Sequence, residues 1–489
     1  MEYVSTRNNK KTFTFKDVFL KGLAPDGGLF IPKKIKKYSK NELKEMAKLN
    51  YIDLATKIVS EFCGSDLQEK ELKNIIKKSY SSFSRNPLKF DFISVTRGPD
   101  IDSARWSLFC GLYDGPTLSF KDFAMQPVGN IYEHFLKANN KKINIIAATS
   151  GDTGSAAIAA LKNKSNINVF VLHPDNKISN IQRKLMTTVD SRNVFNIAIK
   201  GNFDDCQRLV KDMFADKNFS GKINMSAVNS INWARIMFQI VYYFFILLQE
   251  GKKKSYSNEY IFSVPTGNFG NVYAGYIAKK MGLPIKKFIV ATNDNDILSR
   301  VINSGEYRPL KTKPSISPSM DIQTASNFER LLYDVVGEDD AKVRFLMNKL
   351  KNEGGYSLNK KEMNEIKSFF YACSCPDKTA KEHMESISLE GHEVDPHTAT
   401  AIHAADWYVD DHWRNEISEK DESDPDGDNT IIFILETAHP GKFPKAFNDA
   451  TGTEPFIPDN IKNILDKKEN YAKLGNKIDV VKNYILEKI

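Results

Sequence analysis

The sequence contains little cysteine. Its 489 residues include 5 cysteines, an odd number and a small one for a chain of this length. Disulfide frameworks belong to oxidising compartments and mostly to short chains with many paired cysteines. Cys373 and Cys375 have no second cysteine pair nearby, which a zinc site of this kind needs. We therefore expect free thiols in a reducing compartment and no bound metal.

Long hydrophobic runs are missing as well. The most apolar stretch, 236–248, is interrupted by Gln239 and is shorter than the roughly 20 residues that span a bilayer. The first residues have neither the apolar run of a signal peptide nor the arginine enrichment of a transit peptide. We expect a buried helix at 236–248, no membrane contact and a cytoplasmic location.

The charge is spread thinly along the chain. The net charge of +8 comes without a long basic tract, and short lysine clusters at 33–37 and 252–254 are typical of solvated faces. Acidic residues gather at 416–429, a polar segment almost free of apolar side chains. Such a segment buries too little surface to offset its ordering entropy. We expect no nucleic-acid partner and a surface insertion at 416–429.

From residue 141 onward, short apolar runs alternate with amphipathic segments. This alternation predicts an α/β fold, in which a mostly parallel sheet is covered by helices on both faces. Residues 1–95 have apolar residues at helical spacing and predict a small helical region. Ligands of such sheets bind at the carboxyl ends of the strands. The apolar runs are 143–147, 168–172, 194–199, 261–264, 288–291 and 431–435.

Two of these runs lead into glycine turns that open helices. The first, within 145–157, exposes backbone N–H groups at a helix start and predicts a site for a carboxylate or a phosphate. The second, within 262–275, contains Gly267 and Gly270, which allow close backbone approach. It lacks the Gly-Lys-Ser/Thr ending of a nucleotide triphosphate loop. A small phosphate monoester is the more natural ligand there.

A third strand end and a lysine complete the pattern. The run at 431–435 leads to Thr437 and His439, and Lys121 lies upstream in the segment Gly-Pro-Thr-Leu-Ser-Phe-Lys-Asp, 115–122. A lysine together with anion sites in an α/β chain favours a cofactor that carries both an aldehyde and a phosphate.

These residues resemble threonine synthase, a pyridoxal-phosphate enzyme of the tryptophan-synthase-β, or fold type II, superfamily. The segments 5–7 and 26–32 are similar to the longer, microbial and fungal type of this family. The resemblance spans nearly the whole chain and implies a two-lobed α/β enzyme. Its parts would be a helical N-terminal region at 1–95, a large cofactor-binding domain at 96–140 and 236–489, and a smaller α/β domain at 141–235. The matching segments, in chain order, are 115–122, 148–157, 229–235, 265–271, 317–322 and 437–443.

The resemblance also implies roles for individual residues. Lys121 would form the Schiff base with pyridoxal 5'-phosphate, and Thr437 would hydrogen-bond the pyridine nitrogen. The cofactor phosphate would bind Gly267, Asn268, Phe269, Gly270 and Asn271. The substrate carboxylate would bind Thr149, Ser150, Gly151, Asp152 and Thr153, although many superfamily members have asparagine at the position of Asp152. The substrate phosphate would bind Ser230, Asn232 and Arg235, a set that could instead cap a helix and form an ion pair.

The implied activity is the conversion of O-phospho-L-homoserine and water to L-threonine and phosphate, the last step of threonine biosynthesis. It would proceed by β,γ-elimination and hydration with Lys121 as the base, in a monomer or homodimer. Two alternatives remain open. A serine or threonine ammonia-lyase shares the lysine and the turns but needs no second phosphate site, so an Arg235 that points away from the cavity would favour it. A non-catalytic relative that binds the cofactor or a phosphate is disfavoured by the intact 115–122 segment.

Two histidines are further polar candidates, His397 and His439. The spacing of His392, His397 and His403 matches no recognised zinc pattern. We expect capping or core roles for them.

Overall fold

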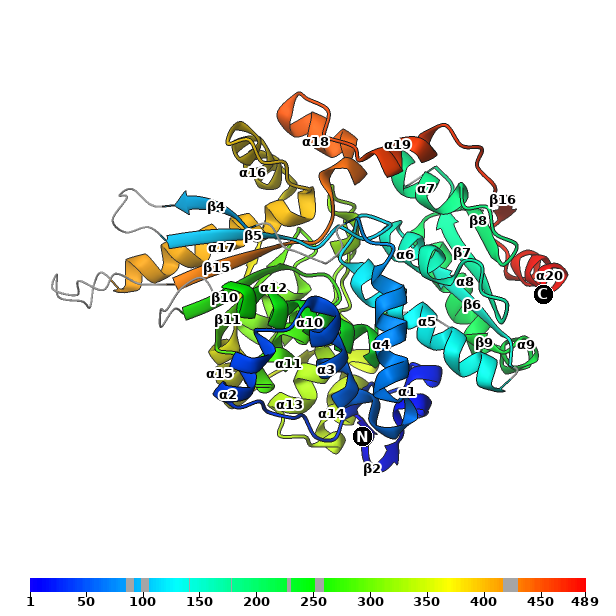
Figure 1. The fold of residues 1–489 in the computed structure, drawn as a ribbon, viewed down its shortest axis with the longest axis horizontal. Helices are drawn as coiled ribbons and strands as arrows, with labels where there is room; N and C mark the ends of the chain where they lie inside the picture. The colour runs from blue at the N-terminus through cyan, green and yellow to red at the C-terminus, as the bar shows by residue number, and fades with distance from the viewer. Residues whose placement is uncertain are drawn as a thin grey trace.

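The computed structural model describes residues 1–84, 92–97, 105–139, 141–176, 178–226, 230–250, 259–416 and 430–489. These residues form two lobes, each built on its own sheet, with an N-terminal region packed against the larger lobe (Figure 1). The α/β architecture predicted from the sequence is confirmed, as is each of the six predicted strands. The acidic segment at 416–429 lies outside the described residues, apart from Glu416 at the end of a helix.

The larger lobe is built on a six-stranded sheet that is parallel except at one edge, where β4 runs antiparallel to β5. Successive residues of its strands face opposite sides. On β10, Phe262 contacts Tyr243 of α10 with ring centroids 4.9 Å apart, while Ile261 packs on the other side with Ala401 of α17. Both faces are therefore covered by helices. The strands, in sheet order, are β14 (Phe370–Ser374), β11 (Ile285–Thr292), β10 (Glu259–Pro265), β15 (Thr430–Glu436), β5 (Arg105–Gly111) and β4 (Phe92–Arg97).

Helix α10 (Trp233–Glu250) is the buried helix that the apolar run predicts. It packs against α5 (Lys121–Asn139) and α11 (Gly270–Lys280) on one face of the large sheet, and α17 (Pro396–Glu416) crosses the other face. Polar side chains are rare on α10, yet Arg235 and Gln239 are both buried there, each 3% exposed. These two polar residues lie one turn apart and face the same side.

The smaller lobe is built on a five-stranded parallel sheet. Its first four strands follow each other along the chain. Its last strand, β16, and the helix after it, α20 (Ile478–Lys488), return from the C-terminus to lie beside β8, although the sequence-based division placed 236–489 in the large domain (Figure 1). The strands, in sheet order, are β16 (Ala472–Gly475), β8 (Val194–Lys200), β7 (Ile167–Pro174), β6 (Ile143–Ala148) and β9 (Met225–Ser226). The helices are α6 (Asp152–Leu161), α7 (Asn180–Thr187), α8 (Phe203–Ala215) and α9 (Lys217–Lys222).

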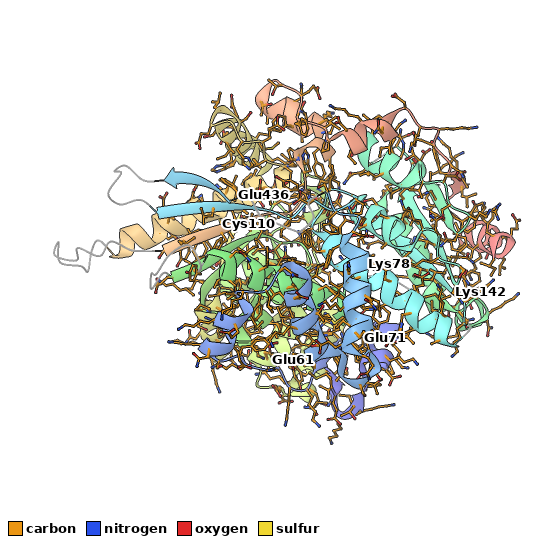
Figure 2. The ribbon with its side chains drawn as sticks, in the orientation of Figure 1. Glu61, Glu71, Lys78, Cys110, Lys142 and Glu436 are labelled. Carbon is orange, nitrogen blue, oxygen red and sulfur yellow. The ribbon has the colours of Figure 1, made fainter. Side chains whose placement is uncertain are left out.

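The N-terminal region contains the predicted helices and a three-stranded antiparallel sheet that the spacing does not reveal. Side chains of this sheet, such as Tyr3 and Phe30, are fully buried. The chain then passes through α4, where Figure 2 labels Glu71 and Lys78, towards the large sheet. The elements are β1 (Tyr3–Ser5), β2 (Asn8–Phe13), α1 (Phe15–Lys21), β3 (Phe30–Pro32), α2 (Lys40–Met46), α3 (Tyr51–Cys63) and α4 (Glu69–Tyr80).

Further helices surround the large sheet and join the two lobes. Among the described helices, none combines the length and the apolar composition that a membrane span requires. The remaining elements are α12 (Ile297–Ser304), β12 (Glu306–Tyr307), α13 (Phe328–Val335), α14 (Asp340–Glu353), β13 (Tyr356–Ser357), α15 (Lys360–Phe369), α16 (Asp377–Leu389), α18 (Pro444–Thr451) and α19 (Asp459–Leu465), with short 3-10 turns η1 (Gly64–Asp66), η3 (Pro318–Met320) and η4 (Pro440–Lys442).

Candidate active site

A cavity of about 500 Å³ lies where strands of both sheets end. The carboxyl ends of β6, β10 and β15 all reach it, as expected for ligand sites of parallel sheets. The predicted site residues line this cavity, with the exceptions of Gly151 and Asn232. Segments that are far apart in the sequence therefore meet at one place.

Lys121 is the first residue of α5, and Asp122 fixes the loop before it. The Oδ2 atom of Asp122 accepts hydrogen bonds from the N–H and the hydroxyl of Thr117, at 2.8 and 2.9 Å. A Cβ atom on Gly115 would lie 2.5 Å from the same oxygen, so the loop needs glycine there. This loop holds Lys121 at the cavity wall, where 8% of the residue is exposed.

The amine of Lys121 contacts a buried carboxylate. Its Nζ atom donates to Asp152 Oδ2 at 3.0 Å and to Ser319 Oγ at 3.4 Å. Burial lowers the pKa of Lys121, against the pull of Asp152, and the nearby cation of Lys442 lowers it further. A larger share of Lys121 is therefore a neutral amine at neutral pH than for an exposed lysine.

The first glycine turn, 149–153, opens α6. Gly151, the N-cap of the helix, has φ of 137°, a backbone conformation that favours glycine, and it has no side chain to cap the first turn. The hydroxyl of Thr149 accepts from the N–H groups of Gly151 and Gly154, both at 2.9 Å, and so holds the turn. Ser150 and Thr153 line the cavity beside Thr149. The start of α6 thus faces the cavity with its positive end.

The second glycine turn, 265–271, opens α11. A Cβ atom on Gly267 would lie 2.8 Å from the backbone oxygen of Ser319, so a side chain cannot be placed there without movement. Phe269 has a left-handed backbone with φ of 68° just before the helix. Asn268 donates through its amide to the hydroxyl of Ser230. The turn brings backbone N–H groups and a helix start to the cavity, which is the arrangement that binds phosphate.

Asn271 adds a side-chain donor to this turn. Its Oδ1 atom accepts hydrogen bonds from the hydroxyls of Tyr242 and Tyr243, the latter at 2.9 Å. This fixes the amide so that Nδ2 is the atom left over, and that buried atom has no partner within the described part of the chain. An unpaired buried donor at a helix start fits an anion, so the turn is suited to the phosphate of pyridoxal phosphate.

Arg235 brings a buried cation to the cavity. The residue is 3% exposed, and neither its Nε nor its Nη1 atom has a hydrogen-bond partner among the described residues. Burial lowers its pKa to about 10. Ser230 lines the cavity as well, but Asn232 does not: its amide donates to Phe19 O at 2.9 Å and accepts from Ala234 N at 3.0 Å at the start of α10. The structure thus separates Asn232 from the other two.

Thr437 directly follows β15 and also lines the cavity. Its carbonyl accepts from Phe120 N at 2.9 Å, and Ser119 pairs with Ala438. The third strand end is therefore tied to the loop that carries Lys121.

The two candidate histidines differ in position. His397 lines the cavity, accepts from Ser319 N at 3.3 Å through Nε2, and donates through Nδ1 to Asp395 at 2.6 Å. His439 lies outside the described lining, accepts from Gly441 N at 3.0 Å, and has its pKa lowered to about 4 by burial. His397 therefore orients Ser319, whereas His439 stays neutral and closes a turn.

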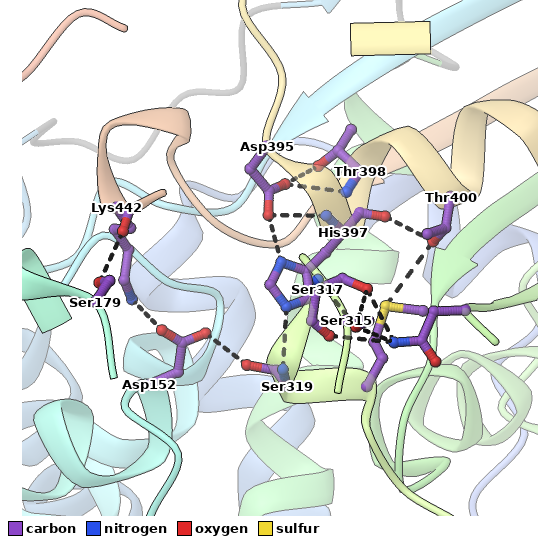
Figure 3. Close-up of polar contacts among 12 residues, drawn as sticks. Asp152, Ser179, Ser315, Ser317, Ser319, Asp395, His397, Thr398, Thr400 and Lys442 are labelled. Atoms are coloured by element: carbon purple, nitrogen blue, oxygen red, sulfur yellow. Dashed lines mark hydrogen bonds and ion pairs between the residues drawn. The ribbon is translucent and has the colours of Figure 1, made fainter. Parts of the chain in front are cut away.

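Three residues of the site received no role from the sequence: Ser319, Gln182 and Lys442. Each contacts Asp152: Gln182 Nε2 at 2.9 Å, and Ser319 Oγ at 3.0 Å and Lys442 Nζ at 2.6 Å, the last two drawn in Figure 3. Ser319 and Lys442 lie within segments that carry the family resemblance, 317–322 and 437–443, and this membership was the signal that could have identified them. Gln182 lies on α7 and gave none.

Family models account for most of the chain. The model described as threonine synthase N terminus matches residues 2–80, the model described as pyridoxal-phosphate dependent enzyme matches residues 113–423, and the model described as threonine synthase, C-terminal, matches residues 414–485. The second of these covers more than half of the chain and contains Lys121 and both glycine turns.

Similar proteins agree with these matches over their whole length. Threonine synthase of Pseudomonas aeruginosa is 39% identical over 99% of this chain and 98% of its own, and that of Saccharomyces cerevisiae is 38% identical over 100% and 98%. The crystal structure of threonine synthase from yeast has a TM-score of 0.89 at 36% identity, covering 100% of this chain and 98% of that one. The structure of threonine synthase with bound pyridoxal phosphate from Brucella melitensis has a TM-score of 0.87 at 37% identity, covering 100% and 99%. From its sequence, its fold and the residues gathered at its cavity, the chain belongs to the threonine synthase family of pyridoxal-phosphate-dependent enzymes.

Proposed function

We propose that the protein converts O-phospho-L-homoserine and water to L-threonine and phosphate, with pyridoxal 5'-phosphate as its cofactor. Arg235 is the observation that carries this proposal. Its buried guanidinium lines the same cavity as Lys121, and two of its nitrogens have no partner in the described part of the chain. An ammonia-lyase acting on serine or threonine has no second phosphate to bind, so a buried unpaired cation there would only reduce stability. A phosphorylated substrate supplies the missing partner, and a forked guanidinium suits it.

Residues of the second glycine turn would hold the cofactor phosphate. Gly267, Asn268, Phe269 and Gly270 would offer backbone N–H groups, and Asn271 would offer the Nδ2 atom that its two tyrosine partners leave free. Thr437 would hold the ring nitrogen with a neutral hydroxyl. The bound cofactor supplies an electron-withdrawing ring that stabilises negative charge at the substrate Cα.

Two further groups of residues would orient the substrate. Its carboxylate would bind the start of α6, where Thr149, Ser150 and Thr153 line the cavity. Its phosphate would bind Arg235 and Ser230. Holding both ends of a short, flexible substrate fixes Cα relative to Lys121, which lowers the entropic part of the barrier.

Lys121 Nζ would move the protons. Its position is set by Asp152 and Ser319, and its lowered pKa favours the neutral amine that a base requires. It would remove the Cα proton; a Cβ proton then leaves, and the Cγ–O bond breaks as phosphate departs towards Arg235. Water adds at Cβ, and protons returned to Cγ and Cα complete threonine.

Product analysis tests this function. The protein reconstituted with pyridoxal phosphate is given O-phosphohomoserine and homoserine separately, and threonine and phosphate are measured. We expect equal amounts of both products from the phosphorylated substrate, none from homoserine, and none with Lys121→Ala. Phosphate without threonine would contradict the proposal, and ammonia with 2-oxobutyrate formed from threonine would identify a lyase.

The finer organisation belongs to the same proposal. We assign the cofactor to the larger lobe and add β16 and α20 to the smaller one, because both pack on its sheet. The expected oligomeric state, a monomer or homodimer, and the expected cytoplasmic location stay predictions. Size-exclusion chromatography with light scattering measures the oligomeric state.

A further inference from the structure

Lys442 is a buried cation that the proposed mechanism does not use. It ends the short turn η4 after β15, and its side chain is fully buried, with 0% exposed. Its backbone oxygen accepts from Ser179 Oγ at 3.1 Å, which ties the turn to the start of α7. It lies outside the described lining of the cavity and so behind the surface that a substrate would touch. Burying an ammonium is costly unless a charged partner is in contact.

That partner is Asp152, which Lys442 shares with Lys121. Asp152 Oδ1 lies 2.6 Å from Lys442 Nζ, and Oδ2 accepts from Ser319 Oγ at 3.0 Å (Figure 3). Oδ1 also accepts from Gln182 Nε2 at 2.9 Å, and Oδ2 also accepts from Lys121 Nζ at 3.0 Å. Both carboxylate oxygens are therefore occupied on opposite sides. The carboxylate cannot rotate without breaking contacts on both sides at once.

The groups around this carboxylate are unequal in charge. Lys121 and Lys442 act on Asp152 with positive charge, His397 adds to their effect, and Arg235 acts on Lys121. Lys442 also acts on the buried carboxyl of Asp122 and on the neutral ring of His439. Burial acts to raise the pKa of Asp152, but Lys121 and Lys442 hold it well below its usual range. The site thus keeps one carboxylate, ionised, between two lysines.

A carboxylate paired with Lys121 alone would hold that amine protonated. An opposite charge within hydrogen-bond distance favours the charged form of a lysine, and a neighbouring like charge disfavours it. Lys442 opposes this effect of Asp152 on Lys121 in two ways. It pairs with the carboxylate of Asp152, and it adds a positive charge near Lys121.

We propose that Lys442 is a positioning residue that shares the charge of Asp152, so that Asp152 orients the amine of Lys121 without holding it protonated. The inference rests on the proposed function only through the role of Lys121 as a base. Asp152 and Lys442 act as one unit, whose two charges cancel while its hydrogen bonds to Lys121 and Ser319 persist.

The pH dependence of kcat tests this inference in the holoenzyme. Lys442→Met removes the shared cation, so Asp152 acts on Lys121 alone and the acidic limb of the profile moves to higher pH by about one unit or more. On that limb the rate falls about tenfold per unit. Lys442→Gln places a neutral amide donor beside Asp152 in place of the charge and is expected to show the same shift. Lys445→Met changes an exposed lysine three residues further on and leaves the profile unchanged.

The result that overturns the inference is a Lys442→Met or Lys442→Gln enzyme whose kcat falls equally at all pH values, or whose acidic limb stays in place. A purely structural role would produce that outcome. Full restoration by Lys442→Gln would also overturn it, because the charge would then be irrelevant.

Unfolding of the full chain without cofactor provides a second readout that is independent of the reaction. Asp152→Asn removes the carboxylate in contact with Lys442 and lowers the unfolding midpoint, and adding Lys442→Met to it restores part of the loss. Additive effects of the two changes would contradict the pairing. If the effects of the two changes on stability are not additive but the wild-type enzyme forms no threonine, the pairing of Asp152 and Lys442 stands and the proposed function is wrong.

Discussion

Replacement of Arg235 by methionine should make the protein without ligands more stable and lower kcat/KM for O-phosphohomoserine strongly. The buried guanidinium has two nitrogens without partners among the described residues, and burial lowers its pKa to about 10. Lowering the pKa of an arginine this far corresponds to roughly 3 kcal/mol of unfavourable burial. Methionine has a similar length and no charge, so Arg235→Met should raise the free energy of unfolding by up to about 3 kcal/mol.

The loss of activity follows from the same two nitrogens. A hydrogen bond to a charged partner contributes about 1.5–3 kcal/mol, so two of them to a substrate phosphate contribute roughly 3–6 kcal/mol. Since about 1.4 kcal/mol corresponds to a factor of ten, kcat/KM for O-phosphohomoserine should fall roughly 10²- to 10⁴-fold. Threonine formation measures this change, and denaturant unfolding without cofactor measures the stability.

Arg330 offers a matched control. It is fully buried and its pKa is also lowered to about 10, but its guanidinium donates to Phe30 O at 3.0 Å, to Ile231 O at 2.6 Å and to Asn327. Arg330→Met would strip these acceptors of their donors and should lower stability by about 1–3 kcal/mol per acceptor. If Arg235→Met lowers stability as Arg330→Met does, or keeps kcat/KM within about threefold, the reasoning about an anion site at Arg235 is wrong.

Two more changes test the cavity and the charge network. Gly267→Ala places a Cβ atom 2.8 Å from Ser319 O. It should weaken pyridoxal-phosphate binding at least about tenfold, measured by cofactor titration, and lower the free energy of unfolding by roughly 1–3 kcal/mol. At Gly221 a Cβ atom meets nothing within 4 Å, so Gly221→Ala should change neither quantity. Glu133, partly buried, has its pKa lowered to about 2, because hydrogen bonds from Lys78, Lys137 and Lys164 outweigh the effect of burial. Since the folded pKa of Glu133 lies below the unfolded value of 4.5, its contribution to the free energy of unfolding is full above about pH 4.5 and is lost as the pH falls towards 2. The loss of stability caused by Glu133→Gln, about 1–2 kcal/mol at pH 7, should therefore shrink on acidification. A deficit independent of pH would contradict the pairing.

Local pattern was sufficient for much of the fold. The run at 236–248 has too few polar residues for a surface helix and too few residues for a membrane span, so a buried helix was the remaining option, and α10 is that helix. Apolar runs followed by glycine turns predicted β6 and β10 with helices after them, because backbone chemistry at such turns is local. By contrast, β16 joins the small sheet beside β8, more than 270 residues earlier in the chain, and no periodicity encodes that pairing.

The site divides in the same way. The place of Gly267 and Asn271 together at the cavity could be predicted, because one turn of the chain holds both. Lys442 and Asp152 are 290 residues apart, and their contact depends on how two lobes meet, so the sequence could not show that one lysine balances the carboxylate facing the other. Asn232 illustrates the reverse: its place in a motif suggested a ligand, but its amide is used by Phe19 and the start of α10.

The fate of the oxygen atoms tests the central claim most directly. Elimination breaks the Cγ–O bond, so phosphate leaves with all four of its oxygens, and the hydroxyl of threonine comes from water. In H₂¹⁸O, we predict one labelled oxygen in threonine at the β-position and none in the phosphate when it is analysed by mass spectrometry. Label in the phosphate, with homoserine as the other product, would mean that water attacks phosphorus and would contradict the assignment of this cavity to elimination and hydration.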